Sequence, residues 1–201
     1  SRPLVEDFAR RLMSRASTEF LEGHSSAWLA SQVRAAFELL QRTSPEDISV
    51  RVRDLPGDTG EFVVQTVMTD RAFIVDTVRE HLHAEGYSIV QLLHPVLRVS
   101  RDEAGRVRAV EDREGEGVRT SVIFILAEGR PDEEERERLH EELRARLQKV
   151  RMATDDFDLM LEASHDVSGD LGEMCEWFPW RTAELEEMQS FLEWLRDDNF
   201  V

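Results

Sequence analysis

The sequence has a single cysteine, Cys175, and no long hydrophobic run. One cysteine permits neither a disulfide nor a thiolate metal cluster within one chain, so we expect a protein of the reducing cytoplasm. No stretch approaches the roughly 20 apolar residues that a membrane-spanning helix needs, and no signal-peptide pattern opens the chain. These absences argue against an integral membrane protein and against a disulfide-rich secreted domain.

Positive charge is also scarce. The chain carries 25 Lys/Arg against 42 Asp/Glu, a formal net charge of −17. Residues 131–201 hold 21 Asp/Glu and 8 Lys/Arg, so this third of the chain supplies −13 of the total. Such a surface repels phosphate backbones and anionic lipids, and we therefore expect no nucleic-acid partner and no membrane partner. A solvated acidic helical face is the simplest interpretation of this charge.

Common catalytic and cofactor motifs are missing. The sequence lacks GxGxxG after a predicted strand, GxxxxGK[ST], HExxH and GxSxG. His81 and His83 lie two residues apart on a predicted helix and face different ways, so we do not expect them to share a metal. Cys175 has only Arg181 as a nearby basic group and is expected to be a small apolar filler. We predict no catalytic, metal-binding or cofactor-binding residue in this chain.

Hydrophobic spacing predicts a helical hairpin over residues 1–44. Apolar residues recur at three- and four-residue intervals over 4–21 and again over 28–40, the period of helices with one buried face. Gly23 fits the end of the first helix, and Ser25 or Ser26 fits the N-cap of the second. Pro45 follows the second helix, which it cannot continue. We expect the aromatic residues of this segment to be core residues.

The period changes to two after residue 44, which predicts an α+β domain over residues 45–151. Strands are expected at 48–54, 61–69, 87–99 and 119–127, and helices at 70–85 and 131–150. Asp70 suits the N-cap of the first of these helices, and Pro95 forces an edge position or a bulge in the third strand. His94 is expected to make a structural hydrogen bond. Residues 102–117 indicate a loose excursion, with a short strand around 107–110 as an option.

The order strand–helix–strand–strand–helix is that of a ferredoxin-like or ACT-type domain without its last strand. Strand 48–54 can occupy the vacant edge position, because it is joined by a hairpin to strand 61–69. We predict a four-stranded antiparallel sheet in the spatial order 48–54, 61–69, 119–127, 87–99, with both helices on one face. The N-terminal hairpin or the C-terminal helices are expected to cover the other face.

Residues 152–201 are predicted to form a C-terminal helical segment that leads into a downstream region. Its first helix spans 152–165 and is expected to break at Gly169 and Gly172. A second helix carries an apolar stripe from Leu185 to Leu195. Between them lie Trp177, Phe178 and Trp180, which we expect to pack between helices. The last residues, 199–201, end on an apolar pair without a terminating signal, as expected for a piece of a longer chain.

One place retains a functional interpretation. Thr69, Asp70, Arg71 and Ala72 form the turn from strand 61–69 into the following helix. Free backbone N–H groups at a helix N-terminus can bind a carboxylate, and Arg71 can add a charge-assisted hydrogen bond. ACT-type domains commonly bind amino acids at this turn. Asp70 opposes this reading, since it can satisfy the same donors and repel an anion. These four residues are our predicted effector-binding site.

Several runs of residues resemble the N-terminal part of the large bacterial NAD-dependent glutamate dehydrogenases. They are Thr-Asp-Arg-Ala-Phe-Ile-Val-Asp-Thr-Val at 69–78, Ile-Val-Gln-Leu-Leu-His-Pro-Val-Leu-Arg-Val at 89–99 and Arg-Asp-Glu-Ala-Gly at 101–105. The resemblance extends to 48–52 and 191–200, so it covers most of the chain. Arg71 and Ala72 stand where that family usually has Met-Pro, and the loop glycine common in amino-acid-binding ACT domains is absent.

The resemblance implies a parent enzyme of amino-acid catabolism. Such an enzyme converts L-glutamate, NAD and water to 2-oxoglutarate, ammonium and NADH. Its catalytic and NAD-binding residues would lie in a downstream domain of the same chain. This chain would then be a regulatory or assembly region of a homo-oligomer, with no cofactor of its own. Two alternatives stay open: a stand-alone amino-acid-sensing ACT-type module, and a purely structural oligomerisation domain.

Overall fold

The computed structural model describes residues 2–57, 59–112 and 115–195, with the side chains of residues 2 and 158 excepted. The chain divides into two compact units, Ser1–Arg151 and Met152–Val201. Part of the sequence motif at 191–200 lies outside the described residues. The predicted chain ending at 199–201 lies wholly outside them. No described helix is long and apolar enough to span a membrane.

The first unit is an α+β domain built on one antiparallel sheet. Its strands are β1 (Ser49–Asp54), β2 (Glu61–Thr69), β3 (Ser88–Leu93), β4 (Val96–Arg101), β5 (Val107–Glu111) and β6 (Val118–Glu128). They follow the order β1-β2-β6-β4-β5, and β3 also pairs with β6. The sheet therefore has six strands in the described part of the chain, and the prediction of four was wrong.

Pro95 accounts for part of this difference. Proline has no backbone N–H to give to a strand ladder, and the predicted strand 87–99 is divided at His94 and Pro95 into β3 and β4. The Pro95 carbonyl still accepts a hydrogen bond from the Val122 backbone N–H at 3.2 Å, which holds the break against β6. The other added strand, β5, pairs with β4 and lies where the sequence offered only an optional short strand.

β6 is the central strand. It pairs with β2 from Glu61↔Glu128 to Thr69↔Thr120 along one edge, and with β3 and β4 along the other edge. Residues 120–127 are all buried, so the strand contributes side chains to both faces of the sheet. Such a strand reads as a continuous apolar run, because neither face meets water.

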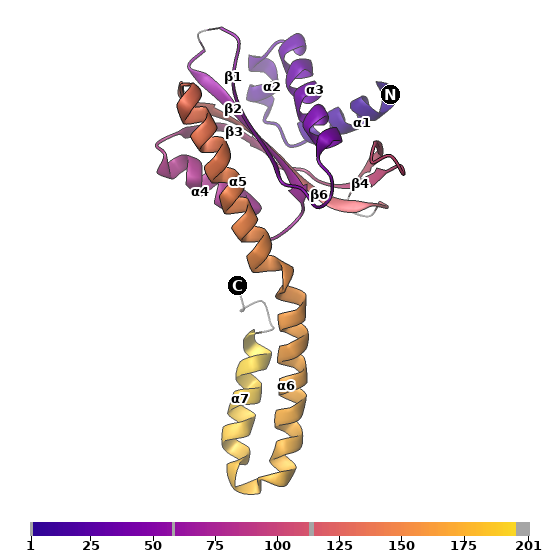
Figure 1. Ribbon diagram of the computed structural model, residues 1–201, viewed down its shortest axis with the longest axis vertical. Coiled ribbons are helices and arrows are strands. Elements are labelled where there is room, and N and C mark those ends of the chain that lie inside the picture. The colour runs from indigo at the N-terminus through magenta and orange to yellow at the C-terminus, as the bar shows by residue number, and fades with distance from the viewer. Residues whose placement is uncertain (1, 58, 113–114, 196–201) are drawn as a thin grey trace. The chain divides into compact units, whose positions relative to one another are not determined.

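A hydrophobic core lies on each face of the sheet. Helices α4 (Ile74–Ala84) and α5 (Glu133–Asp155) cover one face, where their leucines and valines pack against Val64, Ile123 and Ile125. Helices α1 (Arg2–Met13), α2 (Thr18–Gly23) and α3 (Ser26–Arg42) cover the other face and pack against Val63, Phe124 and Leu126 (Figure 1). The buried aromatic residues of the N-terminal segment belong to this second core, as predicted.

The N-terminal segment differs from the predicted two-helix hairpin. Residues 2–42, all of them described, form three helices, because the chain leaves helical geometry after Met13 and a new helix begins behind Ser17. The Ser17 hydroxyl accepts a hydrogen bond from the Phe20 backbone N–H at 3.1 Å. Ser25 does the same for Trp28 at 3.2 Å. Serine is a preferred N-cap because its oxygen satisfies an N–H that has no partner within the helix.

The second unit is an antiparallel pair of helices. Helix α6 (Phe157–Trp177) leads through a short 3-10 turn, Pro179–Arg181, into α7 (Thr182–Trp194). The predicted break at Gly169 and Gly172 was wrong, since α6 continues through both. Glycine costs a helix interior only about 1 kcal/mol, and packing against a neighbouring helix can offset this. The Gly172 position faces Gln189 of α7.

Arg101 ties the sheet to the end of α3. Its guanidinium donates hydrogen bonds to the carbonyls of Leu40 at 2.7 Å and Thr43 at 2.6 Å. It also reaches Gln41 at 3.3 Å and Gly105 at 2.9 Å. The last carbonyls of a helix lack partners within the helix, so a cation placed there satisfies them and interacts favourably with the helix dipole.

Replacement of Arg101 should therefore destabilise the first unit. We expect Arg101→Met to lower the free energy of unfolding by about 2 kcal/mol, since hydrogen bonds to a charged group are lost. Arg108→Met, at an exposed position of β5, is the matched control and should change it by less than about 0.5 kcal/mol. Urea unfolding of both variants tests this, and equal effects would contradict the capping role.

Candidate functional site

The predicted effector site lies where β2 ends and the chain turns towards α4. Thr69 is the last residue of β2, and its hydroxyl donates a hydrogen bond to the Pro45 carbonyl at 2.6 Å. Arg71 is half-buried, and Ala72 is exposed. The four predicted residues thus remain one link between strand and helix, but Thr69 is occupied by the segment that precedes β1.

Asp70 does not have its predicted role. Its backbone N–H donates to the Arg119 carbonyl at 2.9 Å, and its carboxylate accepts from Arg119 Nη2 at 2.7 Å. Both interactions hold Asp70 against β6, and α4 begins only at Ile74. The prediction that Asp70 caps this helix was therefore wrong: strand pairing continues through Asp70, its carboxylate bonds Arg119, and the N-cap position falls three residues later.

Phe73 takes the N-cap position instead. Its φ of 68° is left-handed, and it is the one non-glycine residue with positive φ among those described. An aromatic side chain in this conformation is strained, and such strain is found at functional turns more often than elsewhere. The Phe73 side chain makes no cap hydrogen bond to α4, while the Phe73 carbonyl accepts from the Thr77 backbone N–H at 2.9 Å. The N-cap residue of α4 therefore offers the first-turn N–H groups no side-chain acceptor of the kind that serine or aspartate would supply.

The space beside this turn is small. A cavity of about 10 Å³ is lined by Thr69 together with Thr43, Arg101 and Thr120. This volume holds at most one water molecule and cannot enclose an amino acid. An effector at Thr69–Ala72 would therefore bind on the surface of this unit.

A larger depression lies on the face covered by α1. It has a volume of about 370 Å³ and is lined by Arg11, Ser14, Arg15, Asp112 and residues 94–97. Arg11 Nε lies 3.2 Å from Asp112 Oδ1, so Arg11, one of the two arginines that line the depression, already forms an ion pair. His94 Nε2 lies 2.9 Å from the Ser121 hydroxyl, which is the structural hydrogen bond predicted for it. The sequence pattern did not indicate this depression, because nothing in it relates residues 11–15 to residue 94.

The sequence did not indicate that His81 belongs to a cluster of titratable side chains. Its side chain is buried, and its Nε2 lies 3.3 Å from Oε2 of Glu142 on α5. Glu85, one turn along from His81, completes a group whose ligand atoms lie within 4.8 Å of one another. Burial, and then Arg146, lower the pKa of His81, whereas Glu142 and Glu85 oppose this shift. Sequence reasoning compared His81 only with His83, since Glu142 is far away in the sequence.

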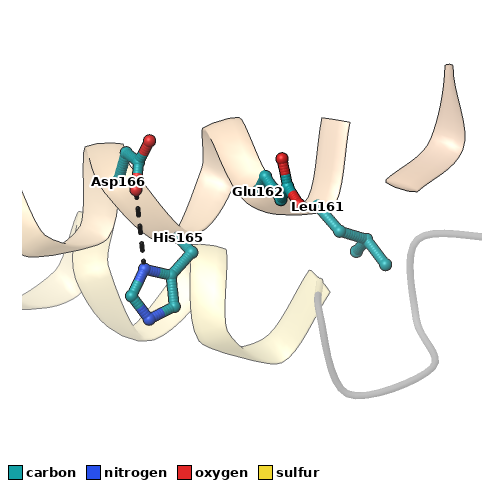
Figure 2. A pocket seen from close by; sticks show the side chains of 4 residues that line it. All are labelled: Leu161, Glu162, His165 and Asp166. Carbon is teal, nitrogen blue, oxygen red and sulfur yellow. Dashed lines mark ion pairs between the residues drawn. The ribbon is translucent and has the colours of Figure 1, made fainter. Parts of the chain in front are cut away.

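The second unit carries exposed groups. Leu161, Glu162, His165 and Asp166 line a depression beside α6, where His165 Nδ1 lies 3.8 Å from Asp166 Oδ1 (Figure 2). All four come from one helix, and both members of this ion pair are largely exposed, so we interpret it as a solvated surface pair.

Two predictions made for this unit have different outcomes. Cys175 is partly buried, and its thiol donates to the Leu171 carbonyl at 3.4 Å, which suits a filler. Trp177 and Trp180 are 75% and 77% exposed, so the prediction that they pack between helices was wrong within this unit. Phe178 contacts Trp180, with ring centroids 5.6 Å apart, but this contact leaves both tryptophans open to solvent.

Comparison with known proteins identifies the family. The family described as "Glutamate dehydrogenase, ACT1 domain" matches residues 8–143. The chain belongs to this family. The match for this ACT1 domain includes the turn at Thr69–Ala72 and the motifs at 89–99 and 101–105, and it ends before α6.

Two curated relatives agree with this assignment. The chain is 27% identical over 207 residues to an "NAD-specific glutamate dehydrogenase" of Pseudomonas aeruginosa, and 29% identical over 217 residues to one of Halomonas elongata. These alignments cover 99% and 98% of the chain. The chain spans only about 13% of the length of each relative. The resemblance to the large NAD-dependent glutamate dehydrogenases is thereby confirmed.

The left-handed conformation of Phe73 in the ACT1 domain can be tested by substitution. Glycine adopts positive φ without steric cost, so Phe73→Gly should be more stable than Phe73→Ala by about 1 kcal/mol. At Glu80, an exposed position within α4, the order should reverse, because glycine is less favourable than alanine inside a helix by a similar amount. Chemical unfolding of the four variants measures both differences. The same order at both positions would contradict the conformation of Phe73.

Proposed function

We propose that the chain is a non-catalytic, N-terminal regulatory or assembly region of a large NAD-dependent glutamate dehydrogenase. The parent enzyme would convert L-glutamate, NAD and water to 2-oxoglutarate, ammonium and NADH in the cytoplasm. NAD and the catalytic residues would belong to a downstream domain of the same chain. The family match, together with the small share of each relative that the chain covers, supports this proposal.

The non-catalytic assignment rests on the contacts that the polar residues of the family motifs make in the structure. Arg101 caps α3, and the Asp102 carboxylate accepts hydrogen bonds from the backbone N–H groups of Ala104 and Arg106. These contacts, led by the Arg106 backbone bond, lower the pKa of Asp102, which keeps it ionised. His94 bonds Ser121, and Asp70 bonds Arg119. The residues that carry the family resemblance are thus engaged in holding the fold.

We further propose that this region has an ACT-like, ferredoxin-type core. It would consist of β2, α4, the β3–β4 pair, β6 and α5, with β1 in the edge position that the last strand of such a domain normally takes. The antiparallel pairing of β1 with β2 supports this assignment. The division of the chain into domains at 1–44, 45–151 and 152–201 remains a prediction.

Regulation would act at Thr69, Asp70, Arg71 and Ala72, through an amino-acid effector. The first turn of α4, whose N-cap residue Phe73 has no capping side chain, supplies N–H donors, and Arg71 supplies positive charge. The contact between Asp70 and Arg119 supports this proposal as well, because the guanidinium of Arg119 offsets the negative charge of Asp70. A stand-alone amino-acid-sensing module would use the same residues.

Assembly is the alternative role, and it would make the chain part of a homo-oligomer. β1 pairs only with β2 and β5 only with β4 among the described strands. Each therefore presents a free edge, where a strand from another copy can add. A purely structural oligomerisation domain would use these edges or the N-terminal helices and would need no ligand.

A thermal-shift screen with amino acids and tricarboxylic-acid intermediates separates these roles, with light scattering to give the mass. A ligand present at 100 times its dissociation constant should stabilise the chain by about 2.7 kcal/mol. For a domain of this size, that corresponds to a rise in Tm of roughly 5–10 °C. Arg71→Ala should abolish the shift, whereas Arg108→Ala, at an exposed position of β5, should leave it unchanged.

Three other outcomes would each contradict part of this proposal. A stable oligomer that shows no shift with any ligand would reject the effector role and favour assembly. A shift that survives Arg71→Ala would place the effector elsewhere. Glutamate-dependent reduction of NAD by this chain alone would overturn the non-catalytic assignment.

A further inference from the structure

His81, Glu85 and Glu142 place three potential metal ligands at the junction of α4 and α5. His81 lies in the last turn of α4 and Glu85 is the C-cap residue four positions later, so the two lie on the same side of the helix. Glu142 reaches the same point from α5. The group combines one imidazole with two carboxylates from helices that cover the same face of the sheet.

The spacing of these atoms suits a tetrahedral ion. Two ligand atoms, each about 2.0–2.1 Å from a tetrahedral zinc ion, lie about 3.4 Å apart. His81 Nε2 and Glu142 Oε2 are 3.3 Å apart. The whole group of ligand atoms falls within 4.8 Å, so a rotation of the Glu85 side chain would bring its oxygen into the same shell.

The state of His81 points to a ligand. Its side chain has no exposed surface, and neither ring nitrogen makes a hydrogen bond to the residues that the structure describes. Buried polar groups in native proteins nearly always have a partner. Nε2 is directed towards the carboxylate of Glu142, which is 41% exposed, so the group is open to solvent from the Glu142 side.

Arg138 is the competitor for this position. Its Nη1 lies 2.7 Å from Glu85 Oε2 and 3.5 Å from Glu142 Oε1, and its own side chain is exposed. A divalent cation would take over both carboxylates and would displace this arginine towards solvent. It would also gain a bond to the lone pair of the imidazole nitrogen, which is a common metal ligand.

We propose that His81, Glu85 and Glu142 bind a divalent cation of the zinc type and thereby link α4 to α5. Imidazole nitrogen together with carboxylate oxygen suits zinc, whereas magnesium and calcium prefer shells made only of oxygen. Three protein ligands leave a fourth position for water. The site would brace the two helices that cover one face of the sheet, independently of the turn at Thr69–Ala72.

Calorimetric titration of the 201-residue chain with zinc chloride, in a buffer that does not chelate, tests this proposal. We expect one saturable site that magnesium chloride does not fill. His81→Gln and Glu142→Gln should each weaken it by at least about tenfold, a loss typical of disturbed metal sites. His83→Gln is the matched control, since His83 is an exposed histidine on the same helix, and it should bind zinc as the parent does.

A variant of Arg138 gives a result of opposite sign. Arg138→Gln removes the competing cation and should tighten zinc binding. Circular dichroism of each variant shows whether it is folded, and the half-exposed Glu142 position keeps the test valid if His81→Gln does not fold. Equal zinc binding by all variants, or no binding by the parent chain, would overturn the proposal.

Discussion

The hydrogen bonding of β6 along both of its edges is the constraint on which the rest of this domain depends. β2 pairs with one edge, while β3 and β4 share the other, and the strand is buried on both faces. Each helical layer can bury its apolar stripe only against side chains that β6 and β2 present alternately to the two faces. Arg101 and Asp70 strengthen this arrangement, because each joins a neighbouring segment to the sheet through charged hydrogen bonds.

Much of this fold could be predicted from local pattern. The apolar run at 122–126 marks a strand buried on both faces, and the leucines at 139, 143 and 147 mark the inner stripe of α5. The breaks were harder to predict. Residues 14–17 keep apolar spacing, yet Ser17 offers a better helix start, so local capping prevails over periodicity there. Gly169 and Gly172 fail as breakers because the penalty for one glycine is small in a helix of this length.

The candidate sites show where local reasoning ends. Asp70 has the composition of an N-cap, but its pairing with Arg119 depends on a strand about 50 residues further along the chain. Phe73 gives no sequence signal for left-handed backbone, because glycine or asparagine would be the usual choice. The His81 group combines side chains from two helices, and sequence spacing cannot show that Glu142 faces His81. The sequence pattern does identify the family, because each motif between residues 69 and 105 is an unbroken run of residues.

The late position of β6 in the chain has a consequence for synthesis on the ribosome. β2 is complete at Thr69, but its partner ends only at Glu128, roughly 60 residues later. At about 5–20 residues per second, the ribosome needs about 3–12 s to cover that interval. During this time β1 and β2 form at most an isolated hairpin, and α1–α3 have no sheet to cover. The nascent chain therefore exposes the apolar side chains of both future cores during this interval, when they can associate with other chains.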